Sequence, residues 1–252
     1  MNWLVVWMSV SDLLISGTMV FGPAFTPRGA LANPFLCSLQ GFLITVGGLG
    51  SAFWNGLMSL HLLISIYRAV PIVNLDPLFK YYHATAWGVP IICALIPLIH
   101  GFVVYGVSGF GDAKLWCWVT EPLLQMLAFY MELWMTFIFT LVVYTLILLR
   151  LGKQNRVANS THTLASKGDL TNNSSRAGRR LILKTLIYAL IFVICWAPAT
   201  ANRLIGLSGG KSPYELNLTH TSVVPIQGFL NAINFFVFSL LLRPSPRKPS
   251  LK

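Results

Sequence analysis

Charged side chains are scarce in this sequence. Of its 252 residues, only 10% are Asp, Glu, Lys or Arg, whereas 55% are hydrophobic. Water-soluble domains carry about 25% charged residues, so this chain lacks the charge needed to cover a surface that faces water. The shortage excludes an ordinary soluble domain and indicates a protein whose solvent is mostly lipid.

Metal-site patterns and internal repeats are missing as well. The four cysteines do not show the paired spacing of zinc sites, and we expect no metal, no cofactor and no catalytic residue. The net charge of +11 would favour a nucleic-acid partner in a soluble protein. Here the basic residues cluster between apolar runs, so membrane topology explains them better and we expect no nucleic-acid partner.

Apolar runs dominate what is present. Six of them are long enough for the roughly 20 helical residues that cross a bilayer. They predict an all-α membrane protein, a transmembrane helix bundle over residues 1–242 followed by a tail at 243–252. The predicted spans are residues 1–22, 36–67, 81–105, 121–150, 180–206 and 221–242.

The distribution of Lys and Arg predicts the orientation, because cytoplasmic loops retain these residues. Of the 18 Lys and Arg, 14 fall on one side of the predicted membrane, so both ends of the chain are expected in the cytoplasm. Segment 151–178 is rich in Ser, Thr and Asn and is predicted to be a flexible cytoplasmic loop. We expect a multi-pass protein of the plasma membrane.

The first run begins at Met1 without a polar lead or a charged flank. We interpret this as a bundle from which an earlier helix is absent, since one more span would give seven. A protein built with six spans is the alternative.

Two of the cysteines fall on the predicted outer side. Cys37 lies at the outer end of the second span, and Cys117 lies in the stretch KLWCWVT of the next outer loop. An oxidising compartment favours a disulfide between them, which would tie that loop to the second span. Cys93 and Cys195 lie within spans and are expected to be small apolar fillers. Asn217 has the one N-x-[ST] sequon in a predicted outer loop, and we predict glycosylation there.

Ionisable residues inside spans are costly and usually mark function or a buried pair. Asp12 lies near the middle of the first span and is expected in a polar core, either as a helix–helix hydrogen-bonding group or as part of a switch. Glu132 and Arg203 could pair with each other or line a ligand pocket. An anionic ligand would favour Arg203, whose alternative is snorkelling to the interface.

Amide side chains recur on single helix faces. Gln227, Asn231 and Asn234 follow each other at i, i+4 and i+7, and Ser51 and Asn55 share a face of the second span. A lipid-facing surface would not carry amides, so both faces should point inward. Asn234 is assigned to the polar core with Asp12. The predicted ligand-pocket residues are Asn55, Glu132, Arg203, Gln227 and Asn231.

Pro198, in the stretch ICWAPA, is predicted to kink its helix below Trp196. A kinked helix could swing its inner end and open a cytoplasmic pocket for a G protein. Basic residues at that mouth are predicted to face the G protein, although attraction to the anionic leaflet explains them too. They are Arg68, Arg150, Arg179, Arg180 and Lys184.

Seven stretches of the sequence resemble one known family, in the order expected for it. They are SVSDLLISG (9–17), CSLQGFLI (37–44), SAFWNGLMSLHLLISIYRAV (51–70), LWCWVTE (115–121), FYMELWMTFIF (129–139), RLILKTLIYALIFVICWAPATANRL (180–204) and IQGFLNAINFF (226–236). Together they resemble the cyclic-AMP-receptor-like G-protein-coupled receptors of slime moulds, fungi and other microbial eukaryotes. The resemblance implies six of the seven receptor helices, an extracellular ligand, a heterotrimeric G protein as partner and no enzymatic activity.

One position departs from the receptor pattern. Arg68 stands where many receptors place a switch arginine, but no acidic residue precedes it.

Two other functions remain as alternatives. A channel or transporter would fit six spans, although neither a voltage-sensor arginine pattern nor repeated broken helices are present. A rhomboid-type intramembrane protease would use Ser108 of GVSG with His220 as its base.

Overall fold

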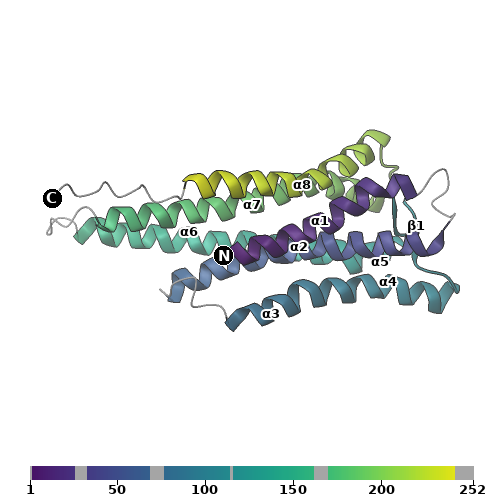
Figure 1. Ribbon diagram of the computed structural model, residues 1–252, viewed down its shortest axis with the longest axis horizontal. Coiled ribbons are helices and arrows are strands. Elements are labelled where there is room, and N and C mark those ends of the chain that lie inside the picture. The colour runs from purple at the N-terminus through teal and green to yellow at the C-terminus, as the bar shows by residue number, and fades with distance from the viewer. Residues whose placement is uncertain (1, 26–32, 69–76, 114–115, 162–169, 242–252) are drawn as a thin grey trace, which may run out of the picture.

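The chain forms a bundle of long helices that run side by side along one axis (Figure 1). The computed structural model describes residues 2–25, 33–68, 77–113, 116–161 and 170–241. Within these ranges six helical segments are long and apolar enough to cross a membrane, as the sequence predicted. The elements are α1 (Asn2–Phe25), α2 (Pro34–Arg68), α3 (Phe79–His83), η3 (Ala84–Gly88), α4 (Val89–Tyr105), β1 (Phe110–Asp112), β2 (Cys117–Val119), α5 (Pro122–Gln125), η4 (Met126–Tyr130), α6 (Met131–Thr161), α7 (Leu170–Leu207) and α8 (Tyr214–Leu241).

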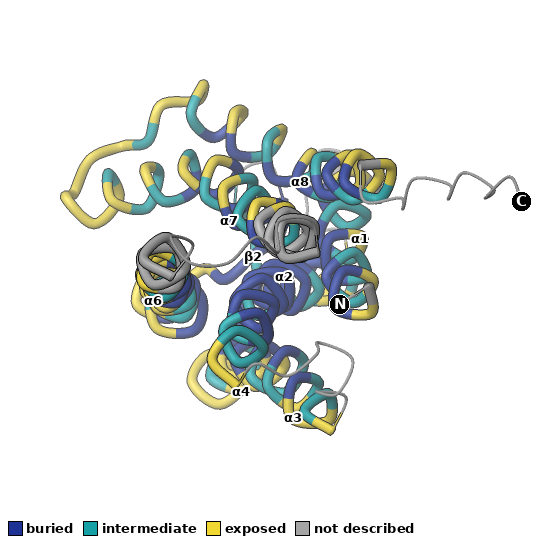
Figure 2. The backbone as a smooth tube through the Cα atoms, turned by 90° about the vertical axis from the view of Figure 1, so that its left-hand side faces the viewer, coloured by how far each residue is buried: buried dark blue, intermediate teal, exposed yellow. Residues whose placement is uncertain are grey.

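Helix α2 occupies the centre of the bundle. Seen from the end in Figure 2, it is the most continuously buried element, with α1, α4, α6 and α7 around it. Glycines permit the closest approach, since a Cβ atom at Gly47 would lie 2.8 Å from the backbone nitrogen of Ile15 and 3.0 Å from the carbonyl of Ser11. Small residues at such contacts let membrane helices pack through van der Waals contact and hydrogen bonds.

Two of the spans contain a short π-helical turn. In one, α3, η3 and α4 follow each other without a break, and in the other α5, η4 and α6 do so. Helix α4 ends at Gly106, whose φ of 71° lies in the left-handed region. Glycine adopts this conformation without the steric cost that a side chain adds, so the chain turns there into the hairpin.

A small β-hairpin differs from the predicted all-α fold. Strands β1 and β2 have three residues each and pair antiparallel, with Phe110 opposite Val119 and Asp112 opposite Cys117. The sequence predicted only an outer loop here, because strands this short have too few residues to show an alternating pattern.

The predicted loop at 151–178 is wrong over much of its length. Helix α6 continues to Thr161, and α7 already begins at Leu170. The stretch has no proline, and polar residues such as Lys, Gln and Arg are good helix formers. Low apolar content therefore marked the end of the membrane span rather than the end of the helix.

Candidate functional site

The carboxylate of Asp12 is the centre of a buried polar cluster. Ser51 Oγ donates to Asp12 Oδ1 at 2.7 Å, Gln227 Nε2 donates to the same oxygen at 2.9 Å, and Asn231 Nδ2 donates to Oδ2 at 2.8 Å. Gln227 Oε1 in turn accepts the indole N–H of Trp196 at 2.9 Å. These contacts join α1, α2, α7 and α8, so a change at Trp196 reaches Asp12 through a single side chain.

This cluster contains two residues that were predicted to line a ligand pocket. Gln227 and Asn231 instead use their amide groups on Asp12, and both are almost fully buried. The inward direction of their face was predicted correctly, and their role in a ligand pocket stays a prediction. The carboxylate needs donors in an apolar interior, and an amide directed at it satisfies that need.

Two further amides hold the inner half of α7. Asn55 Nδ2 donates to the carbonyl of Tyr188 at 3.1 Å, and Asn234 Nδ2 donates to the carbonyl of Lys184 at 3.1 Å. The two carbonyls are one helical turn apart, and the amides come from α2 and α8. We call this pair of contacts the α7 clasp. Asn55 therefore lies in a helix contact, and the structure does not place it in an outer pocket.

Pro198 lies inside α7, two residues after Trp196, as predicted. Proline has no N–H, so it cannot donate to the carbonyl four residues earlier, and its ring crowds that turn. The α7 backbone is consequently least supported between the Asp12 cluster and its outer end.

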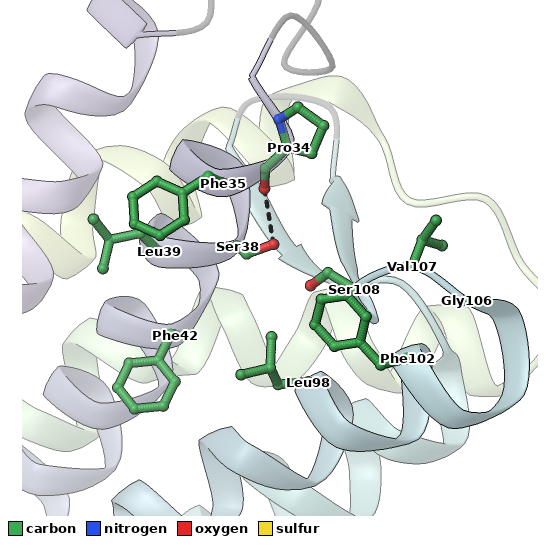
Figure 3. A pocket seen from close by; sticks show the side chains of 10 residues that line it. All are labelled: Pro34, Phe35, Ser38, Leu39, Phe42, Leu98, Phe102, Gly106, Val107 and Ser108. Carbon is green, nitrogen blue, oxygen red and sulfur yellow. Dashed lines mark hydrogen bonds between the residues drawn. The ribbon is translucent and has the colours of Figure 1, made fainter.

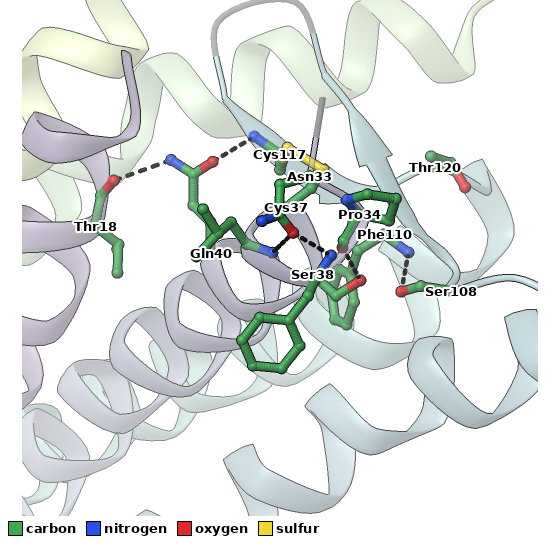
Figure 4. The surroundings of a disulfide bond; sticks show 12 residues. Thr18, Asn33, Pro34, Cys37, Ser38, Gln40, Ser108, Phe110, Cys117 and Thr120 are labelled. Atoms are coloured by element: carbon green, nitrogen blue, oxygen red, sulfur yellow. Dashed lines mark hydrogen bonds between the residues drawn. A yellow bond between two sulfur atoms is a disulfide. The ribbon is translucent and has the colours of Figure 1, made fainter. Parts of the chain in front are cut away.

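The outer end of the bundle is covered by the hairpin. A disulfide joins Cys37 and Cys117, which confirms the predicted bond, and Figure 4 shows the hydrogen bonds around it. The backbone N–H of Cys117 donates to Gln40 Oε1 at 2.9 Å, while Gln40 Nε2 donates to the carbonyl of Thr18 at 2.9 Å. The covalent bond and this amide together fasten the hairpin to α1 and α2.

Beneath the hairpin lies a tightly filled aromatic pocket. Its free volume is only about 10 Å³. The ring of Trp116 contacts His220 edge-on at 5.0 Å between centroids, and Trp118 contacts Phe129 at 5.2 Å in the same manner. Trp196 lies at the pocket's inner side and also belongs to the Asp12 cluster. We call this the outer pocket; its lining residues are Met19, Ile44, Trp116, Trp118, Phe129, Tyr130, Trp196 and His220.

Arg203 is the one predicted ligand residue that lies beside the outer pocket. Its guanidinium carbon lies 5.2 Å from the centre of the Tyr130 ring and 5.9 Å from that of Trp118. Its Nε is buried and has no hydrogen-bond partner. Glu132 forms no ion pair with it, so of the two alternatives the structure does not support the pairing, and the ligand-pocket role stays a prediction. Aromatic faces stabilise the arginine instead of a carboxylate.

The predicted G-protein face is only partly exposed. Arg68 and Arg180 are exposed, and Arg150 lies over the ring of Tyr67 at 5.3 Å. Lys184 is buried, with Nζ 4.5 Å from the centre of the Phe235 ring. The long side chain packs into the α7–α8 contact, so Lys184 is not at the surface of this structure, and its role at the G-protein face stays a prediction. The side chain of Arg179 lies outside the described residues.

Asn217 does not suit the predicted glycan. The side chain is 6% exposed, with Nδ2 donating to the carbonyl of Pro213 at 2.9 Å and Oδ1 accepting from Asn202 at 2.8 Å. A glycan on Nδ2 would require this buried amide to leave its partners. The sequon lies in the first turns of α8, which begins seven residues before the predicted span.

A separate apolar hollow of about 570 Å³ opens between the outer ends of α2 and α4 (Figure 3). Its two serines already have partners: Ser38 Oγ donates to the carbonyl of Pro34, and Ser108 Oγ accepts the N–H of Phe110. Ser108 faces this hollow, whereas His220 contacts Trp116 in the outer pocket. The protease alternative required these two side chains together, and the structure separates them.

Comparison with known proteins decides the family. A sequence profile described as the slime mold cyclic AMP receptor matches residues 6–243. The chain belongs to this receptor family. It is consequently an integral, multi-pass membrane protein, and membership argues against the channel and protease alternatives.

Individual relatives agree with the family. Cyclic AMP receptor-like protein A of Dictyostelium discoideum is 24% identical over 91% of this chain, which spans 53% of that relative. G-protein coupled receptor 157 of Homo sapiens is 26% identical over 78% of the chain, which spans 62% of it. Squid rhodopsin shares the fold, with a TM-score of 0.63, 11% identity, and coverage of 94% of this chain and 82% of its own. The chain thus spans a little over half the length of these two relatives.

The sequence analysis missed most of the outer pocket. Tyr130 had no assigned role, and His220 was considered only as a protease base. The signal that could have found them is the aromatic density of "WCW" and "FYMELW", both in the predicted outer half of the bundle.

Proposed function

We propose that this family member is a transmembrane signalling receptor, which passes the binding of an extracellular ligand to a heterotrimeric G protein. It does so at the plasma membrane and without covalent chemistry of its own. Family membership and the rhodopsin-like fold support this function. The relatives include proteins named as cyclic AMP receptors, but the outer pocket of this chain is filled by its own side chains and its shape indicates no ligand.

The observation that carries the proposal is the position of Trp196. Its ring lines the outer pocket, and its N–H is bonded to Gln227 of the Asp12 cluster. Displacement of this ring by a ligand breaks or moves that bond and so changes the contact between α7 and α8. A ligand acts by favouring one of two arrangements of the helices, to the extent that it binds one more tightly.

Movement of the inner half of α7 would transmit the signal to the G protein. The α7 clasp and the contact of Lys184 with Phe235 hold it against α2 and α8. Release of these contacts lets α7 move outward, which is a common form of helix displacement in receptors and switches. The movement would expose Lys184 beside Arg150 and Arg180 and give a basic surface for the G protein.

The test is nucleotide exchange on a heterotrimeric G protein reconstituted with the receptor in lipid nanodiscs. We expect binding of a labelled, non-hydrolysable GTP analogue to be faster than with empty nanodiscs. Replacing Arg179 and Arg180 by alanine together should reduce the acceleration, because two of the five basic residues predicted to face the G protein lose their charge. Equal exchange with receptor and with empty discs, in the presence of cyclic AMP or of lipid extract, would contradict the proposal.

A further inference from the structure

An apolar cleft runs between α6 and α7 on the lipid side of the bundle. Its volume is about 330 Å³, which lies within the usual range of small-molecule sites. Ala197, Ala201 and Leu204 of α7 are exposed along it, and Trp196 forms part of its floor. The lining residues are Leu133, Trp134, Phe137, Phe192, Val193, Trp196, Ala197, Thr200, Ala201 and Leu204.

The surroundings of this cleft determine what fits it. Both helices are membrane-length here, with spans at Pro122–Lys153 and Arg180–Leu207, so the cleft opens to hydrocarbon. Its side-chain hydroxyl, on Thr200, already accepts the indole N–H of Trp134 at 3.4 Å. An occupant of the cleft therefore gains by being mostly apolar, since the hydroxyl of Thr200 already accepts a hydrogen bond and the other lining residues are apolar or tryptophan.

A cation lies beside the outer end of the cleft, although it is not one of the cleft's lining residues: the guanidinium of Arg203 lies between the cleft and the rings of Trp118 and Tyr130 in the outer pocket. Arg203 precedes the lining residue Leu204 and rests on the ring of Tyr130, which in turn contacts Trp134 at 5.8 Å between centroids. Its Nε is buried without a partner, and no carboxylate of a described residue pairs with it. A partly buried, unneutralised guanidinium favours an anion, and its planar donors suit a carboxylate.

Access from water is closed in this conformation. Trp116, Cys117 and Trp118 of the hairpin are at most 6% exposed, and the outer pocket beneath them has room for about one water molecule. Trp196 can nevertheless be reached through the α6–α7 cleft, from the bilayer.

We propose that the α6–α7 cleft binds a single-chain anionic amphiphile, a fatty-acid-like carboxylate that arrives through the outer leaflet. Its carboxylate pairs with Arg203, and its tail lies along Trp134 and Ala201 toward Phe192. From Arg203 to Phe192 is roughly 16 Å along the helix, the reach of a medium-length acyl chain. The bound tail would press on Trp196. Any effect of this contact on signalling rests on the proposed receptor function.

Binding can be measured without a G protein, so that its failure and the failure of coupling are separate results. The full chain is placed in phosphatidylcholine nanodiscs and titrated with 11-bromoundecanoate, whose bromine quenches indole fluorescence near contact. We expect saturable quenching that dodecanoate reverses. Dodecanol has the same tail without the charge, and we expect it to compete at least tenfold more weakly.

Three variants locate the site. Ala201→Phe fills the cleft and should abolish the saturable quenching, while Ile194→Phe adds the same ring at a lipid-exposed position of α7 outside the cleft and should leave it unchanged. Arg203→Gln should weaken binding of the probe about tenfold, and Arg203→Lys should restore most of it. Folding of each variant is checked by its thermal midpoint.

Three outcomes would overturn the inference. One is equal quenching in Ala201→Phe and in the unaltered chain. Another is competition by dodecanol as strong as that by dodecanoate, which would remove the role of Arg203. The third is a fall in the saturable quenching when the phosphatidylcholine content is raised at a constant probe-to-lipid ratio. Phosphatidylcholine would then compete with the probe, and an ordinary phospholipid would be the occupant.

Discussion

The ammonium nitrogen of Lys184 lies 4.5 Å from the centre of the Phe235 ring, which places a buried cation of α7 on an aromatic face of α8. A cation–π contact away from water contributes from below 1 to about 2 kcal/mol. Because it holds α7 inward, Phe235→Leu should raise nucleotide exchange in the absence of ligand, by about fivefold for a loss of about 1 kcal/mol.

The control for this variant is Phe229→Leu, on the same helix but 67% exposed. It makes the same exchange of side chains at the lipid surface, and its basal exchange should match that of the unaltered chain. Identical basal rates for the two variants would show that the Lys184 contact does not restrain α7.

Asp12→Asn tests the polar cluster. The three hydrogen bonds from Ser51, Gln227 and Asn231 all need an acceptor at position 12, and an amide there directs an N–H₂ group at one of the donors. Leaving a buried polar group unpaired costs about 1–3 kcal/mol, so the thermal midpoint should fall by about 4–8 °C for 2 kcal/mol. Ser9→Ala removes a hydroxyl bonded only within its own helix and should lower the midpoint far less.

The disulfide can be tested by counting free thiols before and after reduction. In a chain carrying Cys93→Ala and Cys195→Ala, denatured but unreduced protein should bind no maleimide–polyethylene glycol, and reduced protein should bind two. Adding Cys117→Ala should free one thiol and lower stability by about 4 kcal/mol in the chain-entropy account, because the bond closes a loop of 80 residues. A label on the unreduced double variant would contradict the bond.

Trp196→Phe separates binding from transmission. Phenylalanine keeps a ring in the outer pocket but deletes the N–H that Gln227 accepts. We expect binding of the bromoundecanoate probe to change by less than threefold, while the rise in nucleotide exchange that ligand produces falls by tenfold or more. Trp87→Phe, at a tryptophan that contacts Trp7 and Trp54 instead, is the matched control and should keep its full response.

The local sequence pattern was sufficient to predict the membrane-spanning helices and the direction in which their polar faces point. The apolar runs predicted the six spans, and amide spacing predicted that Gln227 and Asn231 point inward. Which partner an inward amide meets depends on the relative depth of α1 and α8, and helical spacing contains no information on that. The pairing of these amides with Asp12 therefore emerged only from the packed bundle.

Other differences have physical reasons of their own. Lys184 was assigned to the G-protein face because it belongs to one basic stretch with Arg179 and Arg180, yet its long apolar stem lets the ammonium reach Phe235 inside the α7–α8 contact. For Arg203, pairing with Glu132 was one of two alternatives, and the structure places aromatic faces beside the guanidinium instead. The orientation inferred from Lys and Arg stays a prediction, although Cys37 and Cys117 meet on the side that it made extracellular.

The glycine-lined contact of α2 has a practical consequence for measuring motion. A Cβ at Gly47 would collide with α1, and α2 is enclosed by neighbours along most of its length (Figure 2). This helix has little freedom to shift, so a spin label at its C-terminal end, near Arg68, is a stationary reference point. Distances from that label to a second one on α7 would then report displacement of α7 alone.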